Sequence, residues 1–291
     1  MSDLASRLAT GAFRLLSLLP LRTLQAVGAA AGRLMHARSA KFRREFDRNL
    51  AGAVPQADAA LIRAAAAHSG RTMLELPWLW LRPRAEVLRA VVQVSGWECV
   101  ERLHASGRGV VLLTPHMGAF EIAARLIGSR IPITVLYRAP RQAWLAPVMA
   151  RGREGDGVSL AAADGSGVRR LLRTLKDGGL VGILPDQVPA NGEGLWADFF
   201  GRPAYTMTLA ARLTSIAAGT VMVFAERLPA GRGFHLHFIE PEVPVEGDTA
   251  QRVDAINRNV EALVRRWPAQ YIWGYKRYKR PPGVERPAAV E

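Results

Sequence analysis

Between residues 91 and 267 the chain alternates short apolar runs with longer stretches of helical periodicity. The run 110–114, Val-Val-Leu-Leu-Thr, is almost wholly apolar and β-branched, which is typical of a strand buried on both faces. Comparable runs predict strands over residues 91–94, 133–137, 180–184, 220–226 and 234–239. Helices are expected over residues 98–106, 118–128, 167–176, 207–218 and 249–267. This alternation predicts an α/β fold with a mixed, mostly parallel sheet covered by helices.

The first 40 residues follow a different pattern. Residues 4–35 are rich in Ala and Leu but carry four arginines, Arg7, Arg14, Arg22 and Arg33. No apolar run is long enough for a spanning helix, and the spread of the arginines does not suit a cleaved signal peptide. The leucines and arginines predict an amphipathic helix that Pro20 interrupts. Such a helix either lies in a membrane interface or packs on the domain core, and periodicity does not choose between the two.

The net charge of the chain predicts an anionic partner. The 291 residues include 39 Lys and Arg against 25 Asp and Glu, a net charge of +14. Such an excess favours nucleic acid, an anionic membrane, a phosphorylated substrate or an acidic carrier protein as the partner. The single cysteine, Cys99, excludes an intrachain disulfide and a cysteine-based zinc site.

Polar side chains follow three of the predicted strands at the point where each strand ends. His116 and Glu121 follow the first strand, Arg138 and Arg141 the second, and Asp186 and Gln187 the third. Ligands of α/β proteins bind beyond the carboxyl ends of the strands, so we expect these groups to gather on one rim.

His116 and Glu121 are the first candidates for chemistry. On one helix their spacing of five would separate them by roughly 140°. With His116 in the strand-to-helix loop and Glu121 in the first helical turn, however, the carboxylate can reach back to the ring. It would then fix the tautomer and leave the other ring nitrogen free as a general base. The alternative is a structural histidine beside an ordinary first-turn glutamate.

Two further clusters have open interpretations. His235 and His237 alternate on one strand and share a face, which could begin a metal site, but no third ligand is evident and an exposed strand face is the simpler interpretation. Residues 267–279 mix aromatic and basic side chains, which suits either nucleic-acid stacking or an aromatic-basic membrane edge.

The motifs at the strand ends resemble the lysophospholipid acyltransferase superfamily, and within it the lipid A late acyltransferases that transfer lauroyl and myristoyl chains. His116 and Glu121 match the His-(four residues)-Asp/Glu motif, and residues 137–141, 184–187, 199–203 and 271–279 are similar to later blocks. The third block, Pro185-Asp186-Gln187, differs from the Pro-Glu-Gly-Thr-Arg of glycerophosphate acyltransferases. The resemblance implies a glycerolipid acyltransferase-like fold, with residues 1–40 as a membrane-associating helical segment, 41–282 as the catalytic domain and 283–291 as a disordered tail.

The resemblance also implies the reaction. Acyl carrier protein would donate a fatty acyl chain to a hydroxyl of a phosphorylated glucosamine disaccharide, with His116 as base and Glu121 orienting it. The backbone N–H groups around Gly118 or Arg138 are candidate oxyanion donors, and the side chains of Arg138, Arg141, Asp186 and Gln187 are candidate substrate-binding groups. Asp186 would either orient an arginine across the cleft or cap the turn before Pro189.

The same resemblance sets the expected surroundings. No metal, cofactor or nucleic-acid partner is expected, and the enzyme would work on the anionic cytoplasmic face of the bacterial inner membrane. The alternatives are an acyltransferase acting on a lysophospholipid, ornithine lipid or phosphoglycolipid, and a non-enzymatic basic binding module.

Overall fold

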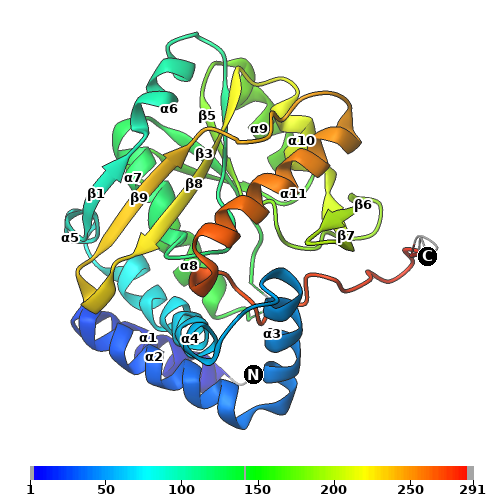
Figure 1. Ribbon diagram of the computed structural model, residues 1–291. Coiled ribbons are helices and arrows are strands. Elements are labelled where there is room, and N and C mark those ends of the chain that lie inside the picture. The colour runs from blue at the N-terminus through cyan, green and yellow to red at the C-terminus, as the bar shows by residue number, and fades with distance from the viewer. Residues whose placement is uncertain (1–2, 141, 287–291) are drawn as a thin grey trace.

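A mixed β-sheet forms the centre of the protein (Figure 1). The computed structural model describes residues 3–140 and 142–286, and within them seven strands pair in the order β1-β9-β8-β2-β5-β3-β4. Every neighbouring pair is parallel except β8 with β9, so the predicted mixed, mostly parallel sheet is confirmed. In sheet order the strands are Val91–Ser95, Phe234–Ile239, Gly219–Arg227, Val110–Leu113, Leu180–Ile183, Ile133–Tyr137 and Val158–Ala162.

Helices cover both faces of this sheet, as the side chains of β2 show. Val111 and Leu113 belong to a core cluster shared with α9, α10 and α11, whereas Val110 and Leu112 belong to a second cluster shared with α5, α6 and α7. Successive strand residues point to opposite faces, so a strand buried on both sides must be apolar throughout. These helices span Gly165–Lys176, Thr208–Thr214, Thr249–Arg266, Arg84–Arg89, Trp97–His104 and Glu121–Arg130, in the order named.

The N-terminal region is a group of helices at one end of the sheet (Figure 1). They are α1 (Asp3–Leu18), α2 (Leu21–Arg38), α3 (Ala40–Ala53) and α4 (Ala59–Leu81), and Pro20 separates the first two as predicted. Glycines let α2 and α4 approach closely, since a Cβ on Gly32 would lie 2.1 Å from the Ala66 carbonyl oxygen. None of the described helices combines the length and hydrophobicity needed to cross a membrane.

Several elements were not expected from the sequence. They are β4, helix α8 (Leu145–Arg153), the antiparallel hairpin β6–β7 (Gly194–Phe199 and Arg202–Met207) and the short helices α5, η1 (Pro229–Gly231) and η2 (Pro268–Gln270). The tight hairpin turn is made by Phe200 and Gly201, both with positive φ. Residues 287–291 of the predicted C-terminal tail lie outside the described part of the chain.

The aromatic-basic stretch after α11 is part of the core rather than a membrane edge or a stacking surface. Tyr271, Trp273 and Tyr278 are buried, and so is Arg277. The Arg277 guanidinium donates to the Tyr205 carbonyl and the Thr206 hydroxyl of β7. The two roles considered for residues 267–279, nucleic-acid stacking and a membrane edge, are therefore wrong for these four side chains, because the β6–β7 hairpin and α3 cover them.

Candidate active site

His116 lies in the loop that follows β2, and its imidazole is bonded to the end of the neighbouring strand β5. Its Nδ1 lies 2.7 Å from Oδ1 of Asp186, and its backbone N–H donates to Oδ2 of the same carboxylate at 3.0 Å. The side chain of His116 is 14% exposed, whereas Asp186 is almost fully buried. His116 thus occupies both carboxylate oxygens of Asp186, one through its ring and one through its backbone N–H. These two contacts hold both the ring and the loop after β2 in place.

The burial of Asp186 opposes its ionisation, but the charge of His116 and its two hydrogen bonds outweigh this and lower the pKa of the carboxyl. An ionised carboxylate beside Nδ1 selects the tautomer that carries hydrogen there. The lone pair is then on Nε2, which lies 2.9 Å from the side-chain amide nitrogen of Gln187. Nε2 is therefore the ring atom that can accept a proton, and Gln187 is the residue that faces it.

Glu121 does not hydrogen-bond His116, so its expected role as the orienting carboxylate is wrong. It is the first residue of α7, and Oε2 accepts from Nε of Arg153 at 2.8 Å and from Nε1 of Trp80 at 2.9 Å. A second Arg153 nitrogen bonds Oε1. The reason lies in the position of the loop, which turns the ring toward β5 while the first turn of α7 faces α4 and α8.

The Glu121 carboxylate is nevertheless part of the site's electrostatics. Burial disfavours its charge, but Arg153, Trp80 and the nearby His116 together lower its pKa. The same ion pair raises the pKa of Arg153 against the effect of burial. Glu121 therefore places a buried negative charge close to the ring of His116.

Gly118 has a backbone role that excludes the expected one. Its N–H donates to the Gln270 carbonyl at 2.8 Å, and its carbonyl accepts from Arg227 at 2.7 Å. Its φ is +57°, and a Cβ there would lie 2.0 Å from the Ala225 carbonyl oxygen. The N–H is already bonded within the protein, so Gly118 is not an available oxyanion donor.

The two predicted arginines have different outcomes. Arg138 is exposed and forms a 3.7 Å ion pair with Glu193 at the rim of a cavity of about 270 Å³. That cavity also includes Asp164 and Arg212. Arg141 lies outside the described residues.

Sequence reasoning missed the residues that hold the loop between β2 and α7 in place. Arg227 of β8 forms a buried 2.7 Å ion pair with Glu75 of α4 while bonding the Gly118 carbonyl. Arg153 and Trp80 hold Glu121 in a similar way. The available signal was Glu75, which stands in an apolar segment of the helix (Met-Leu-Glu-Leu), since a charge that is buried with such neighbours needs a partner.

The chain matches one known family along nearly its whole length. The model of the bacterial lipid A biosynthesis acyltransferases matches residues 4–280. The chain belongs to this family. It is therefore identified as an acyl-transferring enzyme rather than a binding module without catalytic activity.

Individual relatives agree with this lipid A acyltransferase assignment. The chain is 27% identical to a lipid A biosynthesis lauroyltransferase of Escherichia coli (strain K12) over 219 residues, which cover 74% of this chain and 71% of that protein. It is 28% identical to the palmitoleoyltransferase of the same organism, over 73% of this chain and 69% of the relative. A lipid A biosynthesis acyltransferase of Haemophilus influenzae is 25% identical, over 61% and 56%.

Proposed function

We propose that this enzyme carries out a late acylation of a lipid A precursor, with acyl carrier protein as donor and His116 as general base. The observation that carries the mechanism is the His116–Asp186 contact, which leaves Nε2 as a base at a partly exposed ring. Family membership and the relatives' activities support the substrate class.

In the proposed reaction Nε2 removes the proton of an acceptor hydroxyl as its oxygen attacks the thioester carbonyl carbon. A new C–O bond forms, and the C–S bond then breaks. The imidazolium returns the proton to the departing thiolate, so the products are an ester and a free carrier thiol. Asp186 and, from further away, Glu121 stabilise the transient imidazolium.

Gln187 is the proposed donor to the tetrahedral oxyanion. Its amide nitrogen occupies the position beside Nε2 that the acceptor hydroxyl must take, so it has to rotate when the acceptor binds. A side-chain amide can stabilise an oxyanion, and Gln187 replaces Gly118 in this role because the contact of its amide nitrogen with Nε2 of His116 is released when the side chain rotates.

The acyl chain is proposed to begin beside Glu121. A hollow there is lined by Ala124, Val135, Leu136, Leu160 and Leu184. These side chains offer an apolar wall to the first carbons of the chain, while the thioester lies at the polar strand ends.

The N-terminal helices are proposed to dock on the cytoplasmic face of the inner membrane. The α1 helix exposes Leu8, Leu15 and Leu18 at 65%, 68% and 64%, and α2 exposes Val27 and Leu34. Large apolar side chains in water beside arginines are what an interfacial helix requires. The net charge of +14 adds attraction to anionic headgroups, acceptor phosphates and the acidic carrier protein.

The test is acyl transfer by the purified full-length protein. Acyl carrier protein loaded with a defined chain is offered with a phosphorylated tetra-acyl glucosamine disaccharide or with a lysophospholipid, and the products are weighed by mass spectrometry. We expect one acyl mass added to the disaccharide. Transfer to the lysophospholipid alone would overturn the proposal in favour of the phospholipid alternative.

His116→Ala should lower transfer by about 10²-fold or more in a folded protein. The matched control is His104→Gln, because the His104 ring bonds the Gly178 carbonyl at the amino end of β5, whereas Asp186 follows the carboxyl end of that strand. Equal activity of His116→Ala and His104→Gln would end the general-base mechanism.

A further inference from the structure

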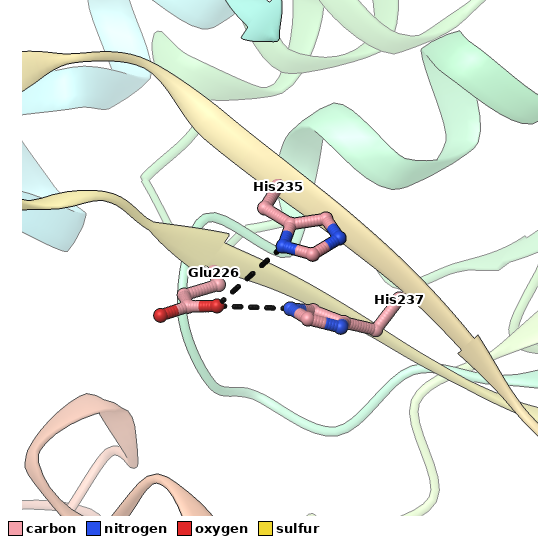
Figure 2. Close-up of side chains that lie close together, drawn as sticks. All are labelled: Glu226, His235 and His237. Atoms are coloured by element: carbon pink, nitrogen blue, oxygen red, sulfur yellow. Dashed lines mark hydrogen bonds and ion pairs between the residues drawn. The ribbon is translucent and has the colours of Figure 1, made fainter. Parts of the chain in front are cut away.

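A cluster of two histidines and a glutamate lies on β8 and β9 (Figure 2). These strands are not the ones that His116 and Asp186 follow, which are β2 and β5. Glu226 is paired across the antiparallel ladder with His235, and His237 is two residues further along β9, so all three side chains share one face. Oε2 of Glu226 lies 2.9 Å from Nε2 of His237 and 3.9 Å from Nδ1 of His235. The third ligand that the sequence did not reveal comes from the neighbouring strand.

We propose that Glu226, His235 and His237 bind a divalent transition-metal ion, with zinc as the reference ion. Two imidazole nitrogens and one carboxylate oxygen form a common three-protein-ligand zinc set that leaves a fourth position for water. Tetrahedral zinc with bonds of about 2.0 Å needs ligand atoms about 3.3 Å apart. The two separations from Glu226 lie on either side of this value, so small side-chain rotations would complete the geometry.

The surroundings select the lone pairs that a metal needs. The hydroxyl of Ser95 lies 2.7 Å from Nε2 of His235 and can accept a hydrogen bond from that nitrogen, and in this tautomer the lone pair of Nδ1 faces Glu226. His237 is held by ring contacts, with Phe224 stacked at 5.7 Å and Trp267 at 4.9 Å. These partners fix the direction of each ligating nitrogen before any ion arrives.

Burial is in the range suited to a bound ion. The side chains of His235 and His237 are each 12% exposed and that of Glu226 is 21% exposed. Glu226 also lines a cavity of about 520 Å³, which gives an ion a route from solvent.

A metal here would stabilise the segment of β8 that hydrogen-bonds the loop after β2, which carries His116. Ala225 accepts a hydrogen bond from the Ala119 N–H, and Arg227 donates to the Gly118 carbonyl. Glu226 lies between these two residues, so the ion would stabilise β8 against β9 at this point. The expected effect is structural, since the ligands do not contact His116.

The experiment is metal binding by untagged full-length protein, first stripped with a chelator and dialysed. Titration calorimetry with zinc should give about one equivalent per chain, cobalt should give the visible absorption bands of a four-coordinate site, and zinc should raise the melting temperature. Glu226→Gln and His237→Gln should each weaken binding by at least about 10-fold.

Two control variants identify the site. His36→Gln removes another histidine that lies 2.7 Å from a carboxylate, that of Asp47, but without a second histidine. His116→Ala removes the catalytic imidazole. Both should retain wild-type zinc affinity. No binding at micromolar zinc, or undiminished binding by folded His237→Gln, would overturn the proposal. If a ligand change prevents folding, Ser95→Ala supplies a milder variant, which should weaken zinc binding because it removes the hydroxyl beside His235.

Discussion

The ring of His116 is held through Nδ1 by Asp186, a residue 70 positions later in the chain, and not by Glu121 in the adjacent helix. Neighbouring parallel strands bring the two together, because β2 and β5 end side by side. The arrangement gives the carboxylates separate tasks. Asp186 sets the tautomer of the proposed base, whereas Glu121 neutralises Arg153 and contributes a nearby negative charge.

Asp186→Asn should therefore reduce acyl transfer strongly while leaving the fold intact. An amide keeps the shape of the carboxylate but no longer selects the Nδ1–H tautomer or stabilises the imidazolium, and a loss of about 10²-fold to 10⁴-fold is expected. Rates and circular dichroism of purified protein measure the two effects. Asp254→Asn, which alters only an ion pair with Arg258 on the surface of α11, is the control. Full activity in Asp186→Asn would contradict the assigned role.

Glu121→Gln should destabilise the protein at neutral pH, because Arg153 would remain buried without its counter-charge. Breaking one side of a buried pair costs about 3 kcal/mol in the free energy of unfolding. Urea denaturation measures this loss, and the double change Glu121→Gln with Arg153→Met should recover part of it. A double variant no more stable than the single one would argue against an uncompensated charge as the cause.

The stability difference between wild type and Glu121→Gln should also depend on pH. The folded-state pKa of Glu121 is lowered, so its contribution is complete above the unfolded value of about 4.3 and disappears as the pH falls through the lower folded value. Denaturation curves collected at decreasing pH should show the gap closing only below about pH 4. A gap that closes nearer neutrality would mean that the carboxyl is not ionised as described.

Gly118→Ala should disrupt the site, since the added Cβ would lie 2.0 Å from the Ala225 carbonyl oxygen at a positive φ. Gly107→Ala is a matched control: its φ is +71° but nothing lies within 4 Å of the added atom. The control should lose about 1 kcal/mol of stability through backbone strain alone, with its rate unchanged. Comparable losses of stability and activity in the two variants would show that close packing at Gly118 is unimportant.

Replacing Leu8, Leu15 and Leu18 together by Ser should lower partitioning onto anionic vesicles by more than about 10-fold, because the apolar face of α1 is lost. Sedimentation with vesicles measures the bound fraction. Val92→Ser with Ile216→Ser removes exposed apolar side chains outside the N-terminal helices and should leave binding unchanged. Equal binding of the triple variant and wild type would assign docking to another surface.

Much of the fold follows from local pattern. The β-branched runs at 110–114, 133–137 and 180–184 mark the buried strands, and their polar ends mark the rim where His116, Asp186 and Gln187 meet. The strand β4 was missed because Val-Ser-Leu-Ala-Ala is short and rich in small side chains, which gives no clear period.

The partners within the site could not be read from spacing. The five-residue step from His116 to Glu121 is visible in the sequence, whereas the bond to Asp186 depends on which strands are neighbours. The Gly118 N–H is bonded by Gln270, more than a hundred residues away, and Glu226 meets His235 only through strand pairing. Long-range hydrogen bonds of this kind are set by topology, so a local motif identifies the participants without assigning their roles.

The glycine contact between α2 and α4 joins the N-terminal helices and the candidate active site into one mechanical unit. The helix α4 that α2 rests on carries Trp80, which bonds Glu121, and Glu75, which bonds Arg227. With backbones this close, α2 cannot tilt without carrying α4 along. With the N-terminal helices docked on a membrane as proposed, the protein fixes the height of His116 above the lipid, so the acceptor hydroxyl would have to rise to that height out of the lipid layer.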